Sequence, residues 1–159
     1  MIIIFSIVAL VILFIVIGKI SSLQGDYFKE KVNIMRIFSS FLTDLKLDKT
    51  DKNMNPTNIE NTRNNILYFS KRLVKIQELY AYNKKINKNF DENEEEKTYI
   101  LEVVKIFNES MNNWLDFYKS ELENLTESLQ DKEQQTKNIA FKRALDLQRR
   151  RINMYSQKM

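Results

Sequence analysis

The chain has 159 residues, a net charge of +4, no Cys, no His, two Gly and one Pro. This length fits one domain, or one domain with an added terminal segment. Without Cys or His, the chain cannot form disulfides, a lipid-modified cysteine, Ser-His-Asp or Cys-His catalytic sites, or the usual zinc, haem and copper sites. Two glycines are too few for a Gly-rich phosphate loop or for a β-protein with many tight turns. We therefore expect an all-α protein that is not an enzyme and binds no cofactor or metal.

The first 17 residues form an uncharged apolar run, in which Ser6 is the only polar residue. As a helix with a rise of about 1.5 Å per residue, this run is about 26 Å long. A hydrocarbon core is about 30 Å thick, and Gly18, Lys19 and Ile20 supply the difference because the Lys19 ammonium can extend into the headgroups. The sequence predicts a transmembrane anchor over residues 1–20.

Two alternatives to a retained anchor remain open, a cleaved signal peptide and a buried core helix. A signal peptide has a basic start, 7–15 apolar residues and a small-residue cleavage site. Here only Met1 precedes the run, the run is longer, and Ile20 would occupy the −3 position for cleavage after Ser22. A mature chain that begins near Leu23 would identify a signal peptide.

The distribution of basic residues predicts the orientation of the anchor. No Lys or Arg precedes the apolar run, whereas Lys19, Lys29, Lys31 and Arg36 follow it closely. Because basic residues near a membrane span favour the cytoplasmic side, we expect a single-pass membrane protein with its N-terminus outside and its body in the cytoplasm.

Residues 21–159 are predicted to form one helical domain, with helices over about 20–47, 57–88, 92–132 and 137–157. Each helix has a seam, which here means apolar residues repeating every three or four positions along one face. The main seam residues are Ile20, Leu23, Tyr27, Ile34, Phe38, Phe41 and Leu45; Ile59, Thr62, Ile66, Phe69, Leu73, Ile76 and Tyr80; Val104, Phe107, Met111, Trp114, Tyr118, Leu122, Leu125 and Leu129; and Phe141, Leu145, Gln148, Ile152 and Tyr155. Phe28, Met35 and Leu42 lie beside the first seam.

Several local signals mark the helix ends. Gly25 is a point at which the first helix could kink. Residues 48–56 are polar and end in the single Pro, and Thr57 with Glu60 fits a capping box. Asp91 can cap the third helix, whose acidic start suits the helix dipole. Residues 130–138 contain no Gly or Pro and are compatible with either a turn or continuous helix.

The aromatic side chains in the seams indicate how the helices pack. An extended coiled coil prefers Leu and Ile in its seams. Aromatic residues such as Phe69, Phe107 and Trp114 instead favour an antiparallel bundle of three to four amphipathic helices with coiled-coil-like seams. We expect Trp114 to lie in the core rather than at a partner interface.

Charge is distributed in blocks along the chain. Residues 19–56 carry +2, residues 57–90 carry +5, residues 91–136 carry −9 and residues 137–159 carry +6. One interpretation is an acidic third helix between basic neighbours, whose exposed ion pairs contribute about 0–1 kcal/mol each. The other is a basic face that meets anionic lipid or nucleic acid. Nucleic acid is the weaker candidate, since the aromatic residues lie in the seams and not among the basic residues.

The strongest basic candidates for contact with a membrane surface or a partner are Lys142, Arg143, Arg149, Arg150 and Arg151. Each basic residue near an anionic leaflet could contribute about 1 kcal/mol of attraction. The alternative is a solvated helix end, where cations also suit the dipole.

Other short patterns carry no functional information. The carboxylate pairs Asp91/Glu95, Glu92/Glu96 and Glu123/Glu127 are interpreted as solvated acidic surface, since a di-iron bundle would also need His. The glycosylation patterns at Asn108 and Asn124 occur as often as chance predicts in an Asn-rich chain.

Together these features predict a non-enzymatic, single-pass membrane protein whose helical body is a tethered docking or assembly module for a protein partner. Anionic lipid and a second copy of the chain are further candidate partners. The alternative is an exported helical binding or immunity protein with a cleaved N-terminal signal.

Overall fold

The computed structural model describes residues 2–50, 56–86, 94–126 and 132–159, and within these ranges the chain is helical without any strand. It contains four helices, α1 (Ile2–Thr50), α2 (Pro56–Ile86), α3 (Glu94–Thr126) and α4 (Lys132–Ser156). The predicted all-α class and the long apolar helix at the N-terminus are therefore confirmed.

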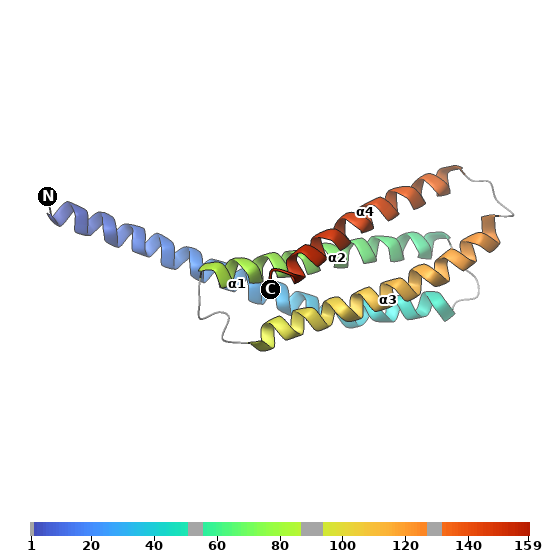
Figure 1. The fold of residues 1–159 in the computed structure, drawn as a ribbon, viewed down its shortest axis with the longest axis horizontal. Coiled ribbons are helices and arrows are strands. Elements are labelled where there is room, and N and C mark those ends of the chain that lie inside the picture. The colour runs from blue at the N-terminus through green and yellow to red at the C-terminus, as the bar shows by residue number, and fades with distance from the viewer. Residues whose placement is uncertain (1, 51–55, 87–93, 127–131) are drawn as a thin grey trace.

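The helices lie side by side, and consecutive helices run in opposite directions (Figure 1). α2 contacts the other three helices, and α1 also contacts α3. The N-terminal part of α1 projects beyond this body with no other helix beside it (Figure 1). The molecule thus has two regions, a projecting arm and a packed body, which share one helix.

α1 continues without a break from the apolar run into the body. The predicted boundary between anchor and body at residue 20 is therefore not a helix end. The kink considered at Gly25 is also absent as a break in the helix, because neither Gly25 nor Gly18 has a positive φ. A glycine inside a helix costs only about 1 kcal/mol relative to Ala. The neighbouring turns of a helix of 49 residues can therefore hold both glycines in the helical conformation.

Most of the buried core residues are predicted seam residues, although Ile100, Val103 and Met159 are buried as well and Ile20 and Leu23 are only partly buried. All seven seam residues of α2 are buried, and Trp114 is fully buried, as predicted for a core residue. The Phe41 and Phe69 rings stack with a centroid distance of 4.6 Å, and Phe107 contacts both at 5.6 Å. Aromatic pairs at such distances stabilise a core beyond the burial of their area.

The start of the last helix differs from the predicted one. Lys132 already belongs to α4, so the start predicted at residue 137 is too late, while residues 127–131, at the predicted end of the third helix, lie outside the described residues. The Glu, Gln and Lys residues at the start of α4 are good helix formers despite their polarity, which explains the earlier start.

At the start of α2, Pro56 is the first helical residue, a position where its missing N–H costs nothing. Thr57 therefore lies inside the first turn and not at the predicted cap, and Glu60 pairs with Arg63 at 3.4 Å. The predicted cap Asp91 lies outside the described residues, as do the side chains of Tyr118, Leu122, Leu125, Leu129, Glu123, Glu127 and Asn124.

Candidate interaction surfaces

The described part of the chain has two shallow hollows and several exposed apolar faces. It contains no group of three acidic residues that could hold a metal ion. A shallow hollow between α1 and α2 is lined by Ile37, Ser40, Phe41, Asn65, Tyr68 and Phe69.

The projecting arm of α1 is a continuous apolar surface. From Leu10 to Ile17 every residue is apolar and exposed, with exposed fractions between 46% and 73%. The exposure covers all sides of the helix, because eight consecutive residues turn more than twice around it. Within the described residues, this is the one helix long and apolar enough to cross a membrane, and it lies near the N-terminus.

A second hollow lies where the arm meets the body. It is lined by Val16, Lys19, Ile20, Tyr82, Lys85 and Ile86. The last turn of α2 therefore lies beside α1 at the end of the apolar run, and it brings Lys85 and the half-exposed Tyr82 close to Lys19. The amide of Asn83 donates to the carbonyl of Leu23 at 3.2 Å, which fixes α2 against α1 at this level.

The predicted basic residues of α4 divide into two sets. Arg149 donates to the side-chain oxygen of Asn112 on α3, and Arg151 pairs with Glu78 on α2 at 2.7 Å. Lys142, Arg143 and Arg150 are exposed, and none has an assigned polar contact among the described residues. Part of the predicted set thus holds the body together, while the rest faces outward.

The outward face of α4 is apolar as well as basic. Ile139, Leu147 and Met154 are exposed by 52%, 57% and 41%, respectively. With about 100° between successive residues, these three side chains share one face with Arg143 and Arg150. Sequence analysis identified the arginines and missed these apolar neighbours, because Phe141, Leu145 and Ile152 already gave this helix a complete seam.

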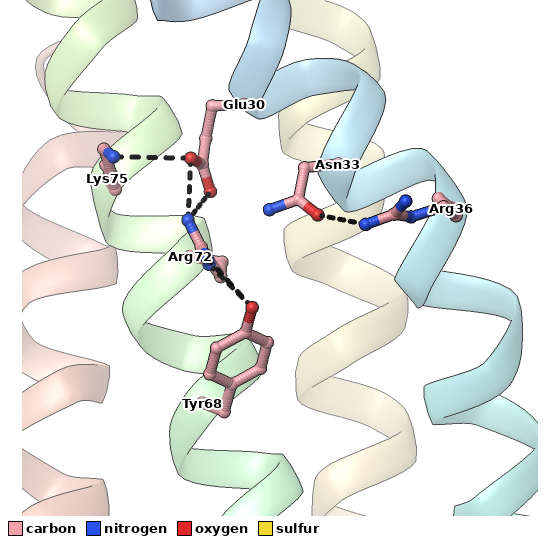
Figure 2. Close-up of polar contacts among 6 residues, drawn as sticks. All are labelled: Glu30, Asn33, Arg36, Tyr68, Arg72 and Lys75. Atoms are coloured by element: carbon pink, nitrogen blue, oxygen red, sulfur yellow. Dashed lines mark hydrogen bonds and ion pairs between the residues drawn. The ribbon is translucent and has the colours of Figure 1, made fainter.

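A buried carboxylate fixes α1 against α2. The Glu30 side chain is only 5% exposed and accepts from Arg72 at 3.0 Å and 3.2 Å, with the Lys75 ammonium 3.5 Å away (Figure 2). Arg72 also donates to the Tyr68 hydroxyl at 2.9 Å (Figure 2). The Tyr68 hydrogen bond, followed by the Glu30 charge, raises the pKa of Arg72. Sequence analysis missed Glu30, although its spacing of three from Tyr27 and four from Ile34 places it on the seam.

A second polar contact joins α1 to the start of α3. Glu96 accepts from the Tyr27 hydroxyl at 2.6 Å and from Lys31 at 2.5 Å. The Lys31 ammonium also lies 5.4 Å from the centroid of the Tyr99 ring. Burial, then the Glu96 charge, raises the pKa of Tyr99. The interpretation of Glu96 as solvated surface is therefore wrong, and Lys31, which interrupts the seam of α1, has its partner here.

α1 also exposes apolar residues inside the body. Phe28, Val32 and Met35 are exposed by 51%, 66% and 55%, respectively. The prediction placed Phe28 and Met35 beside the seam, and the structure leaves both on the side of α1 away from α2. The spacing of four and three puts all three residues on one face.

Comparisons with protein-family models, curated proteins and solved structures find no match for this chain.

Proposed function

We propose that this chain is a non-enzymatic, single-pass membrane protein whose helical body, residues 21–159, is a docking and assembly module held at the bilayer surface. The observation that carries the proposal is the arm of α1, where Leu10–Ile17 are apolar on every side and continue directly into the body helix. A helix with no polar face and no neighbouring helix is suited to lipid and poorly suited to water.

The junction between arm and body supports the same arrangement. Lys19, Lys85 and Tyr82 surround the point where α1 would leave the hydrocarbon. Tyr and Lys are the residues that favour the headgroup region. Lys85 adds to the basic residues that follow the anchor in the sequence, and we therefore propose that the body lies on the cytoplasmic side.

We propose that partner proteins bind the outward face of α4. Gln77 of α2 donates to the carbonyl of Ile152, so these two residues lie at one level. Gln77 lies nine residues before Ile86, which is at the junction, and Arg143 lies nine residues before Ile152. Because α2 and α4 run in opposite directions, the two distances add, and at about 1.5 Å per residue Arg143 lies about 27 Å beyond the junction. This exceeds the screening length of about 8 Å at physiological salt, which favours a protein partner over lipid for Arg143 and its neighbour Lys142. An acidic amphipathic segment would match Arg143, Arg150 and the apolar residues between them.

The mechanism is concentration at a surface. A body tethered to the bilayer meets membrane-bound partners at a much higher effective concentration than a free domain would. The four helices would fold as an antiparallel bundle with coiled-coil-like seams, which gives the docking face a rigid support.

Membrane extraction tests the proposal. After expression with residues 1–159 intact, the protein should float with lipid vesicles and stay with the membranes after a carbonate wash. Recovery of the full-length chain in the soluble fraction would overturn the proposal. N-terminal sequencing of the recovered chain distinguishes the exported alternative, which requires a mature start near Leu23.

The lack of native Cys makes the orientation measurable with one reporter. Asn153→Cys places a thiol on an exposed position of α4. If the body is cytoplasmic, a membrane-impermeant maleimide should label this thiol only after the cells are permeabilised. Labelling in intact cells would reverse the proposed orientation.

A further inference from the structure

One face of α1 has no neighbour among the described residues of the body. Phe28, Val32 and Met35 project from it, although α2 and α3 cover other sides of the same helix. This face extends back into the arm at intervals of seven residues, which keep the same side of a helix. We call it the α1 outer face, and it comprises Val11, Phe14, Gly18, Ser21, Gly25, Phe28, Val32, Met35 and Ser39. All of these residues are exposed except Gly25, which is half-buried.

Lipid does not reach the upper part of this face. If residues 1–20 cross the bilayer, Phe28 and Met35 lie about 12 Å and 22 Å beyond Ile20 along the helix. The headgroup region adds only about 5–8 Å on each side of the hydrocarbon. Exposed apolar side chains spaced at four and three residues in water are typical of a binding face for another helix.

We propose that the α1 outer face binds the same face of a second copy, in a parallel and in-register pair of α1 helices. This inference rests on the proposed membrane anchor, which holds two copies at the same height and in the same direction. Under that constraint each residue meets its own counterpart, so the face must be complementary to itself. Apolar residues at 28, 32 and 35 and small residues at 18, 21 and 25 meet this condition.

The small residues set how closely the two helices approach. A Cβ added at Gly18 or Gly25 would meet no atom within 4 Å, so the surface over both glycines is open. Small residues that recur on one face let helix backbones approach closely, as in membrane helix pairs. The pair would therefore be closest near the bilayer surface and wider where Phe28 and Met35 interdigitate.

The charges along the two edges of the face are complementary. Lys29 and Arg36 lie along one edge and are exposed. α3 borders the other edge, where the Lys31 ammonium lies over the Tyr99 ring. Glu95 lies four residues before Tyr99 and Glu102 lies three residues after it, so both share the side of α3 on which Tyr99 lies. Both glutamates are exposed. In a parallel two-fold pair opposite edges meet, so Lys29 and Arg36 of one copy face Glu95 and Glu102 of the other.

Disulfide crosslinking in membranes tests this pairing. Phe28→Cys, Val32→Cys and Met35→Cys each introduce the single thiol of the chain. Upon mild oxidation, each variant should give a band of twice the chain mass. Asp26→Cys is the matched control, because Asp26 is exposed at the same level but on the opposite side of α1. Equal crosslinking of the Asp26 variant, or bands that match a different protein, would overturn the pairing.

A second variant separates pairing from folding. Phe28→Glu and Val32→Glu, combined with Met35→Cys, change only exposed positions. The helical circular dichroism and the melting temperature should therefore stay unchanged, while the doubled band of the Met35→Cys chain disappears. Lys29→Glu with Arg36→Glu should reduce crosslinking, and adding Glu95→Lys with Glu102→Lys should restore it. Persistence of the doubled band in the Phe28→Glu, Val32→Glu background would also overturn the pairing.

Flotation of the same samples distinguishes the two proposals. Chains that float with vesicles but show no doubled band retain the anchor and disprove the pairing. Chains that remain soluble yet show position-specific doubled bands disprove the anchor and support the pairing.

Discussion

The two halves of α1 differ in where their apolar residues point. In Leu10–Ile17 all eight residues are exposed. In the half that lies in the body, Tyr27, Ile34, Phe41 and Leu45 are buried, and the residues between them are polar except on the sides of this seam and on the exposed α1 outer face. Both halves belong to one unbroken helix, so backbone geometry does not distinguish them. The difference shows that the packing of neighbouring helices against one half of α1 follows the periodicity of its apolar residues and not their number, and the arm, which has no such periodicity, suits the lipid surroundings that we propose for it.

Charges placed in the arm should produce the largest effect. Leu10→Arg with Leu13→Arg puts two charges where insertion disfavours Arg by about 2.5–3.5 kcal/mol each. The variant should move from the membrane to the soluble fraction upon flotation. Ile139→Arg with Leu147→Arg is the matched control, because these side chains on α4 have nearly the same exposed fractions as Leu10 and Leu13. If both variants float alike, the arm of α1 does not hold the chain in the membrane.

A matched pair of isoleucines should show the next largest effect. Ile34→Ala removes a side chain that is 1% exposed and leaves a cavity, so the free energy of unfolding should fall by about 2–5 kcal/mol. Ile15→Ala makes the same change at a position that is 64% exposed, and it should shift that free energy by less than about 0.5 kcal/mol. Denaturant titration in detergent, followed by the Trp114 fluorescence, measures both. A similar loss in both variants would mean that the arm is part of the folding unit.

The buried carboxylate of α1 should matter more than an exposed one. Glu30→Gln removes the charge that accepts two hydrogen bonds from Arg72, and we expect the free energy of unfolding to fall by about 1–2 kcal/mol. Glu78→Gln breaks the more exposed pair with Arg151 and should cost less than about 1 kcal/mol. The same denaturant titration compares the two variants, and a larger loss for Glu78→Gln would contradict this ranking.

The sequence was sufficient to predict the helical class, the apolar N-terminal helix and most of the core. Periodicity identifies buried positions well because each helix must cover one face, and all seven predicted seam residues of α2 are indeed buried. Helix ends were less predictable, as at Lys132, because polar helix formers and polar loops share their composition.

Surfaces were less predictable than the core. Periodicity shows which residues of α1 are apolar enough to be buried. It does not show which of them α2 and α3 cover, because that depends on how the helices are arranged around α1, and Phe28 and Met35 lie on a side that neither helix covers. Likewise, sequence alone could not divide the basic residues of α4, because Arg149 and Arg151 are distinguished from Arg150 only by Asn112 and Glu78 on other helices.

The smallest expected effect is an alkaline loss of stability at the contact between α1 and α3. The pKa of Tyr99 in the folded protein is raised above its ordinary value of 10.0, first by burial and then by Glu96. Above that ordinary value the unfolded chain loses the phenol proton while the folded chain retains it. The contribution of Tyr99 to stability is therefore complete below pH 10 and is lost as the pH rises through the higher folded pKa. Tyr99→Phe should make the decline in unfolding free energy above pH 10 shallower and leave its slope at pH 7–9 unchanged. A decline as steep as that of the parent chain would show that the Lys31, Glu96 and Tyr99 contact does not govern the alkaline response of the body half of α1.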